Sequence, residues 1–335
     1  MALKLALYGY DTDLGKLVIE TLEDSTLKVD AFYPLTPLSG EFDAIKLHGR
    51  NFLIGNIEDF DFSTVDVALF LTTKDETQRL STKAREAGAI VIDLSHLYSG
   101  DGKVPLILPE INPEDVVRAV ETRLAVPASS VSTALTLVLH TLHDAYEVKQ
   151  AVATVLESVS EHGRFGTETL ARETAFLLNG RALEESGFEA QVAFNLHTRI
   201  GKSDAQGEAF EEKVIKSEVT RLLGGFSQGL SVTALMVPVF FGHTLCLHVT
   251  LGENVSLEDL KTTLEESEHL ELLDDSDELI TPVTHSVSAE RILVTRVRMC
   301  GPRSCDLMVL FDNARRGEAV NCVALLKLIA AYLKK

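Results

Sequence analysis

The stretch from Arg123 to Leu142, RLAVPASSVSTALTLVLHTL, has residue types and spacing that suit covalent chemistry. It reads as a short apolar strand, a proline turn and a long apolar helix that opens on serines. A turn that delivers a small polar residue onto a helix N-terminus is where many enzymes keep a nucleophile. The sequence therefore indicates a candidate nucleophile where this helix begins.

Three other segments carry polar side chains next to apolar strands. His243 follows the strand-like run MVPVFF and a glycine, and it is either a general acid or base or a hydrogen-bonded structural histidine. The segment LESVSEHGRFG, residues 156–166, is compatible with a polar site or with a strand that ends in a turn. The segment FDNARRGEA is a ligand-facing loop or a capped helix start, and its polar residues are Asp312, Asn313, Arg315 and Arg316, followed by Gly317.

The segment YGYDTDLG, residues 8–15, lies where a dinucleotide-binding fold places its glycine-rich turn. Gly9 and Gly15 occupy two of the glycine positions, and Thr12 occupies the middle one. Asp11 and Asp13 put negative charge where phosphates would lie, although the helix N-terminus itself favours anions. The turn predicts a dinucleotide fold, whereas its charge disfavours tight nucleotide binding.

The first 125 residues must position this turn, and they alternate strand and helix patterns. Short β-branched strands separated by amphipathic helices predict parallel pairing in a doubly wound α/β sheet. The expected strands are residues 3–10, 27–35, 65–73 and 89–95, and the expected helices are residues 11–24 and 75–88.

After Pro127 the strict alternation ends. Long strands flanked by helices predict an α+β domain with a large mixed or antiparallel sheet. The expected strands are residues 146–160, 229–241, 243–252, 289–300 and 306–313, and the expected helices are residues 129–145, 165–178, 210–223 and 315–335.

Composition excludes several classes of protein. A formal net charge of −19 disfavours nucleic acid and anionic membrane as partners, because both repel an acidic surface. The four cysteines have no CxxC spacing, so neither a zinc knuckle nor a disulfide framework is expected, and no metal site is predicted. No signal-peptide pattern and no apolar run of the ~18 residues that span a bilayer are found. We expect a cytoplasmic protein.

Taken together, these segments resemble the aspartate-semialdehyde dehydrogenase family over essentially the whole chain. YGYDTDLG matches the family's GATGxVG turn, VIDLSHLYSGDGKVPLILPEIN matches VVDNSSAFR…VPLVVPEVN, and AVPASS stands at NPNCST. LNGRALEESGFEAQVAFNL matches the segment ending QIAFN, VPVFFGH matches the histidine strand, and FDNARRGEAVN matches SDNLRKGAAxN. The likeness is greatest to the Usg-type paralogues, which share the fold but lack the full catalytic set.

The resemblance implies two domains and a self-associating protein. Residues 1–126, completed by the C-terminal helix 315–335, correspond to the Rossmann-type NAD(P)-binding domain. Residues 127–314 correspond to the catalytic and dimerisation domain, whose large sheet would form a homodimer or a dimer of dimers. A small-molecule ligand is a further possible partner.

In active family members a cysteine thiolate attacks the aldehyde or acyl phosphate, a histidine shuttles the proton, and hydride passes to or from NADP. The cysteine position falls on Ser129, whose hydroxyl cannot be tuned to an anion as a thiol can. The glutamine that orients substrate falls on Glu157, and only His243 keeps its identity among the core positions. The family's substrate-binding positions are altered at Ser99, Glu211, Val214 and Met236: two arginines fall on Ser99 and Met236, and the ExxK motif falls on Glu211 and Val214, which removes a further cation.

The cofactor side is altered in the same way. The resemblance assigns cofactor positions to Gly9, Thr12, Gly15 and Asn313. The glycine pair after the third strand falls on Thr73 and Lys74, and the residues that read the 2′-phosphate have no clear equivalents in LTPLSG, residues 35–40. NADP is implied by the resemblance, but these changes disfavour its binding.

Three functions remain open. The first is a catalytically inactive paralogue with a structural or regulatory role as a dimer. The second is an NADP-dependent oxidoreductase of aspartate-semialdehyde dehydrogenase type with reduced or altered activity. The third is a hydrolase-like set of Ser129, His243 and Glu157, which requires Ser129 Oγ within about 3.2 Å of His243 and Glu157 on the far nitrogen.

Overall fold

The computed structural model describes residues 3–37, 43–183, 186–224 and 229–334. These residues form two compact units, one of residues 1–129 with 318–335 and the other of residues 130–317. Each unit is built on a sheet of its own.

The first unit contains a seven-stranded sheet in the order β5-β2-β1-β6-β7-β9-β8, with every pair parallel. All four residues of β6 and of β7 are buried, as expected for strands that helices cover on both faces. This confirms the predicted parallel α/β sheet. The strands are β1 (Leu3–Tyr8), β2 (Val29–Thr36), β5 (Gly55–Asn56), β6 (Val67–Phe70), β7 (Ile90–Asp93), β8 (Leu106–Ile107) and β9 (Leu124–Pro127).

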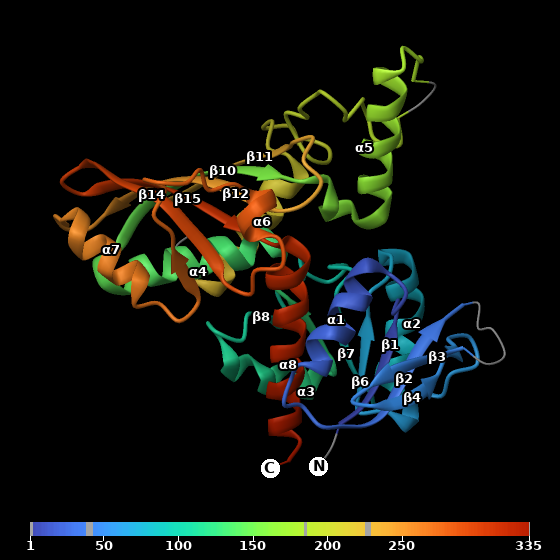
Figure 1. The fold of residues 1–335 in the computed structure, drawn as a ribbon. Coiled ribbons are helices and arrows are strands. Elements are labelled where there is room, and N and C mark those ends of the chain that lie inside the picture. The colour runs from blue at the N-terminus through green and yellow to red at the C-terminus, as the bar shows by residue number, and fades with distance from the viewer. Residues whose placement is uncertain (1–2, 38–42, 184–185, 225–228, 335) are drawn as a thin grey trace. The chain divides into compact units, whose positions relative to one another are not determined.

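Helices lie on both faces of this sheet. Helices α1 (Asp13–Glu23) and α3 (Val116–Thr122) both contact α8 (Val320–Tyr332) on one face, and α2 (Lys74–Glu86) packs on β7 (Figure 1). The apolar core includes side chains from β1, α1 and α8, so the last helix of the chain completes the first unit. A small hairpin, β3 (Ala44–Leu47) with β4 (Arg50–Leu53), was not expected from the sequence.

The second unit contains a six-stranded mixed sheet in the order β11-β10-β12-β15-β14-β13. Its two end pairs are parallel and its three central pairs are antiparallel, which confirms the predicted mixed sheet. The strands are β10 (Val148–Glu157), β11 (Leu230–Met236), β12 (His243–Leu251), β13 (Leu270–Leu272), β14 (Ile292–Gly301) and β15 (Ser304–Phe311).

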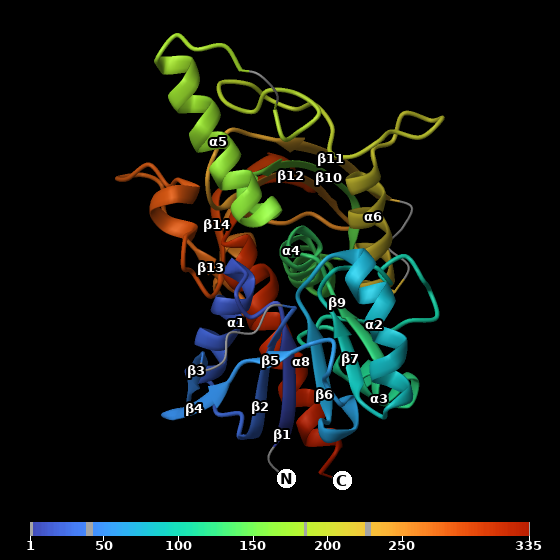
Figure 2. The ribbon, with the colours of Figure 1, turned by 90° about the vertical axis from the view of Figure 1, so that its right-hand side faces the viewer.

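Helices α4 (Ser130–Tyr146), α6 (Phe210–Leu222) and α7 (Leu257–Glu265) cover one face of the mixed sheet, and α5 (Gly163–Leu178) follows β10 (Figures 1 and 2). The other face, called the outer face here, carries alternate residues of β10, β12 and β15 such as Val152, Cys246, His248 and Met308, which are exposed or half-buried. None of the helices in the described ranges is both long and apolar enough to cross a membrane.

The strand expected over residues 229–241 ends earlier, at Met236. Pro238 has no backbone N–H for a strand ladder, and Gly242 has a φ of 84°, which turns the chain before β12. The turn leaves His243 as the first residue of β12.

Candidate functional site

His243 is the centre of a buried polar network in the second unit. Its side chain has no exposed surface. Nδ1 accepts a hydrogen bond from the backbone N–H of Ser158 at 3.2 Å and lies 3.0 Å from Ser158 Oγ. Nε2 lies 3.0 Å from Oε2 of Glu161. Because a backbone N–H points at Nδ1, the ring proton lies on Nε2 and is donated to the Glu161 carboxylate.

The Glu161 carboxylate joins three elements of the unit. Besides His243, its Oε2 accepts hydrogen bonds from Ser130 Oγ at 3.1 Å and from Asn313 Nδ2 at 3.1 Å. Burial by itself would raise the pKa of this carboxyl, but the hydrogen bonds from His243 and from the hydroxyl of Ser130 lower the pKa to about 2. Glu161 is therefore a carboxylate at neutral pH.

A second layer of hydrogen bonds fixes these groups. Ser160 Oγ donates to Asn313 Oδ1 at 2.8 Å and lies 2.9 Å from Ser158 Oγ. The amide of Asn313 thus contacts Ser160 with its oxygen and Glu161 with its nitrogen. We call this set the His243 network, and its members are Ser130, Ser158, Ser160, Glu161, His243 and Asn313.

The local backbone brings the members of the network together. A 3₁₀ turn, Val159–His162, follows β10, and its first two N–H groups bond to the carbonyls of Val239 and Phe240 at 2.9 Å and 3.1 Å. These bonds hold the turn against the segment that leads into His243. Gly317 allows the Asn313 segment to approach the start of α4, because a Cβ at Gly317 would lie only 2.6 Å from Cβ of Ser130.

Glu157 lies beside the network but is not part of it. Its side chain is 2% exposed, and its Oε1 has no hydrogen-bond partner among the described residues. Burial, with the negative charges of Glu211 and Glu161, raises its pKa well above the usual value. The hydrolase-like hypothesis required Glu157 on the far nitrogen of His243. That expectation is wrong, because Glu161 holds Nε2 and Ser158 holds Nδ1.

Two of the other predicted positions in the second unit lie beside Glu157. Met236 is opposite Glu157 in the parallel pair β10–β11 and is buried. Glu211 lies in the first turn of α6, close enough for its charge to raise the pKa of Glu157. Val214 lies three residues further along α6 and is half-buried.

In the first unit, the predicted nucleotide turn has the shape of a dinucleotide-binding turn. Gly9 has a φ of 94°, and a Cβ there would lie 2.1 Å from the carbonyl oxygen of Leu71. A Cβ at Gly15 would lie 2.2 Å from the carbonyl oxygen of Gly9. Thr12 caps α1 by accepting from the N–H of Gly15 at 2.9 Å, so one of the amides that an anion would use already has a partner.

The remaining predicted positions of the first unit are in loops and at helix starts. Ser99 is buried after β7 and its Oγ donates to the carbonyl of His96 at 3.1 Å. Thr73 caps α2, and Lys74 is the first residue of that helix. Ser129 is 8% exposed and directly precedes α4. In LTPLSG, residues 38–40 lie outside the described residues.

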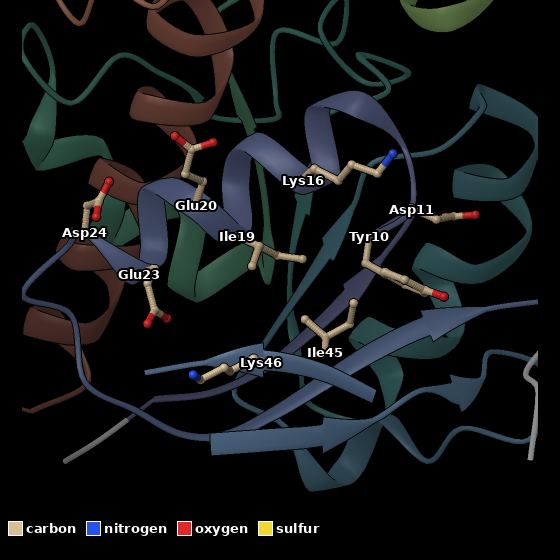
Figure 3. A pocket seen from close by; sticks show the side chains of 9 residues that line it. All are labelled: Tyr10, Asp11, Lys16, Ile19, Glu20, Glu23, Asp24, Ile45 and Lys46. Carbon is tan, nitrogen blue, oxygen red and sulfur yellow. The ribbon is translucent and has the colours of Figure 1, made fainter. Parts of the chain in front are cut away.

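A pocket of about 530 Å³ was not expected from the sequence. It lies beside α1 and β3, where Tyr10, Ile19 and Ile45 are arranged between the helix and the strand (Figure 3). Four carboxylates and two lysines complete its wall: Asp11, Glu20, Glu23, Asp24, Lys16 and Lys46. The excess of carboxylates disfavours an anionic occupant.

Sequence reasoning found His243, Glu157 and Asn313 but missed the groups that bind His243. Ser158, Ser160 and Glu161 all belong to LESVSEHGRFG, the segment whose function was left open. The polar run after a strand was the available signal, but it did not show which side chains would turn toward β12.

Two family models match the chain. The semialdehyde dehydrogenase NAD binding domain matches residues 27–119, and the semialdehyde dehydrogenase dimerisation domain matches residues 139–316. The chain is 29% identical over 327 residues to aspartate-semialdehyde dehydrogenase 2 of Vibrio cholerae, with 97% of each chain covered. It is 33% identical over 332 residues to a USG-1 protein homolog of Azotobacter vinelandii, with 98% of each chain covered.

The fold matches as well. The crystal structure of aspartate semialdehyde dehydrogenase II from Vibrio cholerae has a TM-score of 0.92 to this chain at 28% identity, with 99% of each chain covered. Sequence and fold agree over nearly the whole length. The chain therefore belongs to the aspartate-semialdehyde dehydrogenase family.

Proposed function

We propose that this chain is a catalytically inactive, cytoplasmic member of its family that acts as a self-associating structural or regulatory protein. The observation that carries the proposal is the state of His243. A histidine that shuttles protons needs a ring nitrogen directed at the reacting group. Here Nδ1 is bonded to Ser158, and Nε2 is bonded to a carboxylate that two further donors hold in place.

The nucleophile position supports the same proposal. It falls on Ser129 by its place in AVPASS, and the four cysteines of the chain are at positions 246, 300, 305 and 322. A serine needs a general base to become a nucleophile, and His243 is engaged elsewhere. A serine alkoxide is also a poorer leaving group than a thiolate when phosphate must displace an acyl group.

The charges of the site do not suit an acyl phosphate. Glu157, Glu161 and Glu211 lie close enough for their charges to interact, and the family's cation positions fall on Val214 and Met236. An anionic substrate needs cations or N–H donors to offset its charge in a buried site. We infer that this site does not bind a dianionic substrate.

The backbone of the predicted nucleotide turn fits NADP, but its charges do not. The two glycines of the Gly9–Gly15 turn allow the close backbone packing that a dinucleotide-binding turn uses, and a bound dinucleotide would supply the hydride chemistry of the family. The charges of the turn do not fit a phosphate, because Asp11 and Asp13 flank Thr12. The carboxylate of Asp13 lies in the first turn of α1, where it would compete with a phosphate for the helix N-terminus. We propose that NADP binds weakly or not at all.

Self-association is proposed for the outer face of the mixed sheet. Residues 139–316 match a domain described as a dimerisation domain, and this face carries apolar side chains that are exposed or half-buried among the described residues. Val152, for example, is 38% exposed. Analytical ultracentrifugation should give the mass of a dimer or larger assembly, and Val152→Glu should shift it toward the monomer.

The test of inactivity is a coupled assay with aspartate semialdehyde, phosphate and NADP. We expect no turnover above background from the native chain or from Ser129→Cys, since Glu161 still binds His243. Ser129→Cys with Glu161→Gly restores the thiol and also frees Nε2 of His243, and it serves as the matched comparison. Turnover by Ser129→Cys alone would overturn the proposal.

Nucleotide binding is tested separately by thermal unfolding with NADP. Any ligand that binds the folded state raises the unfolding temperature by mass action. We expect no rise at millimolar nucleotide. A rise that Gly9→Ala abolishes would contradict the proposal and support the NADP-dependent oxidoreductase.

A further inference from the structure

Three metal-binding side chains meet on the outer face of the mixed sheet, and none of them belongs to the His243 network. His248 is on β12, Cys300 is on β14 and Asp306 is on β15, and one ligand atom of each lies within 4.8 Å of the others. Strand pairing fixes this meeting, because β15 lies between β12 and β14 in the sheet (Figure 1). His248 is directly opposite Asp306 in the β12–β15 register.

A β-bulge places the thiol. Residues 298 and 299 pair with 306 and 305, but residue 301 pairs with 304, so Cys300 is an extra residue in β14. Bulges re-aim a side chain and are frequent beside functional sites. The result is an exposed thiol that is hydrogen-bonded to the Asp306 carboxylate.

The carboxylate already binds both neighbouring strands. Asp306 Oδ1 lies 2.7 Å from Nδ1 of His248, and Oδ2 accepts from Nη2 of Arg298 at 2.8 Å. Arg298 can keep Oδ2 while Oδ1 turns to a metal, in the way that outer partners orient a metal-binding carboxylate. The positive guanidinium would also offset part of the negative charge of a thiolate and a carboxylate.

We propose that His248, Cys300 and Asp306 form a binding site for a divalent transition metal of the Zn²⁺ class, with water in the fourth position. One imidazole, one thiolate and one carboxylate are ligands that Zn²⁺ accepts, and three protein ligands with water make a complete tetrahedral set. A tetrahedral zinc site separates its ligand atoms by roughly 3.5 Å. The hydrogen bond between His248 and Asp306, at 2.7 Å, must therefore open on binding, while ligand atoms that are up to 4.8 Å apart move closer together. The thiol proton of Cys300 is released to solvent.

The proposal does not rest on the inactivity of the His243 network. The site does lie on the outer face proposed for self-association, where Val152 is opposite His248, so a dimer formed through this face would hold the metal at its interface. The cysteine spacing in the sequence shows no zinc pattern, because the three ligands come from three different strands. Cys300 is 52 residues after His248, and Asp306 is 6 residues after Cys300. The strand order and the bulge together bring them to one place.

Cobalt is the probe, because Co²⁺ takes zinc sites and a cobalt–thiolate bond gives a charge-transfer band in the near ultraviolet. The full-length, reduced, chelator-treated protein is titrated with Co²⁺, and Zn²⁺ is then added to displace it. We expect one Co²⁺ per chain with a thiolate band that Zn²⁺ removes. Absence of the band when Co²⁺ reaches about 1 mM would overturn the proposal.

Two cysteine variants separate this site from adventitious binding. Cys300→Ser should abolish the thiolate band and weaken Co²⁺ binding by at least about tenfold. The matched control is Cys246→Ser, which removes a half-buried thiol of the same face, two residues before His248. A band that survives in Cys300→Ser or disappears in Cys246→Ser would refute the assignment. Circular dichroism checks that each variant is folded.

Discussion

Replacing Glu161 by glutamine tests whether the His243 network depends on a buried negative charge. The side chain keeps its size but loses the carboxylate that accepts from Ser130, His243 and Asn313. Lowering the pKa of Glu161 from the usual 4.5 to about 2 corresponds to about 3 kcal/mol of stability at neutral pH. This figure is an upper bound, because the side chain is 24% exposed and partly screened by water.

The pH dependence has a definite sign. The folded-state pKa of Glu161 lies below its unfolded value, so its contribution is complete above the unfolded pKa of about 4.5 and is lost as the pH falls toward 2. Glu161→Gln should therefore be less stable than the native chain at about pH 7. The difference between the two proteins should shrink as the pH falls below about 4.5.

The assay is urea unfolding at a series of pH values. The chain has no tryptophan, so circular dichroism of the backbone follows the transition. The control is Glu168→Gln on α5, which removes an exposed carboxylate bound to Arg164 and should change stability by less than about 0.5 kcal/mol. A Glu161→Gln protein as stable as the native chain at about pH 7, or a difference independent of pH, would refute the reasoning.

Three further substitutions test single features by the same unfolding measurement. Glu157→Gln should stabilise the chain at neutral pH, because a carboxyl whose pKa is raised in the folded state destabilises the fold once the pH exceeds its pKa in the unfolded state. The gain in stability should vanish in acid. A loss of stability at neutral pH would contradict the assigned burial. Gly317→Ala should cost about 1–3 kcal/mol, because its Cβ would meet Ser130 at 2.6 Å. Gly9→Ala should cost about 2 kcal/mol or more, because it combines a φ of 94° with a Cβ 2.1 Å from a carbonyl oxygen. Gly100→Ala is the control for both, since a Cβ there meets nothing within 4 Å.

The two sheets were predictable because their strands carry local signals. Val67–Phe70 and Ile90–Asp93 are short apolar runs between helices, and a strand buried on both faces needs that composition. The long strands after Pro127 similarly indicated a mixed sheet. Residues 229–241 were predicted as one strand because the apolar run continues through Pro238, whereas the ladder ends at Met236.

The partners of His243 were not predictable because they depend on pairing between distant segments. Leu156 pairs with Thr244, and the N–H of Val159 bonds to the carbonyl of Val239, so the turn after β10 lies against the start of β12. Only this pairing shows that Glu161 faces His243. The metal-binding set is a similar case, because the direction of Cys300 depends on a bulge.

Glu157 and Glu161 show why residue type alone could not assign the chemistry of the site. Both are acidic and four residues apart, yet burial raises the pKa of Glu157 and hydrogen bonds lower the pKa of Glu161. The difference lies in donors: Oε2 of Glu161 accepts three hydrogen bonds, whereas Oε1 of Glu157 has none from the described residues. Paired carboxyls with opposed pKa shifts are typical of acid–base catalysis, but here the charged member is bound to the histidine that would have to act with it. The same contact that keeps Glu161 ionised also occupies Nε2 of His243, and the proposed inactivity rests on this contact.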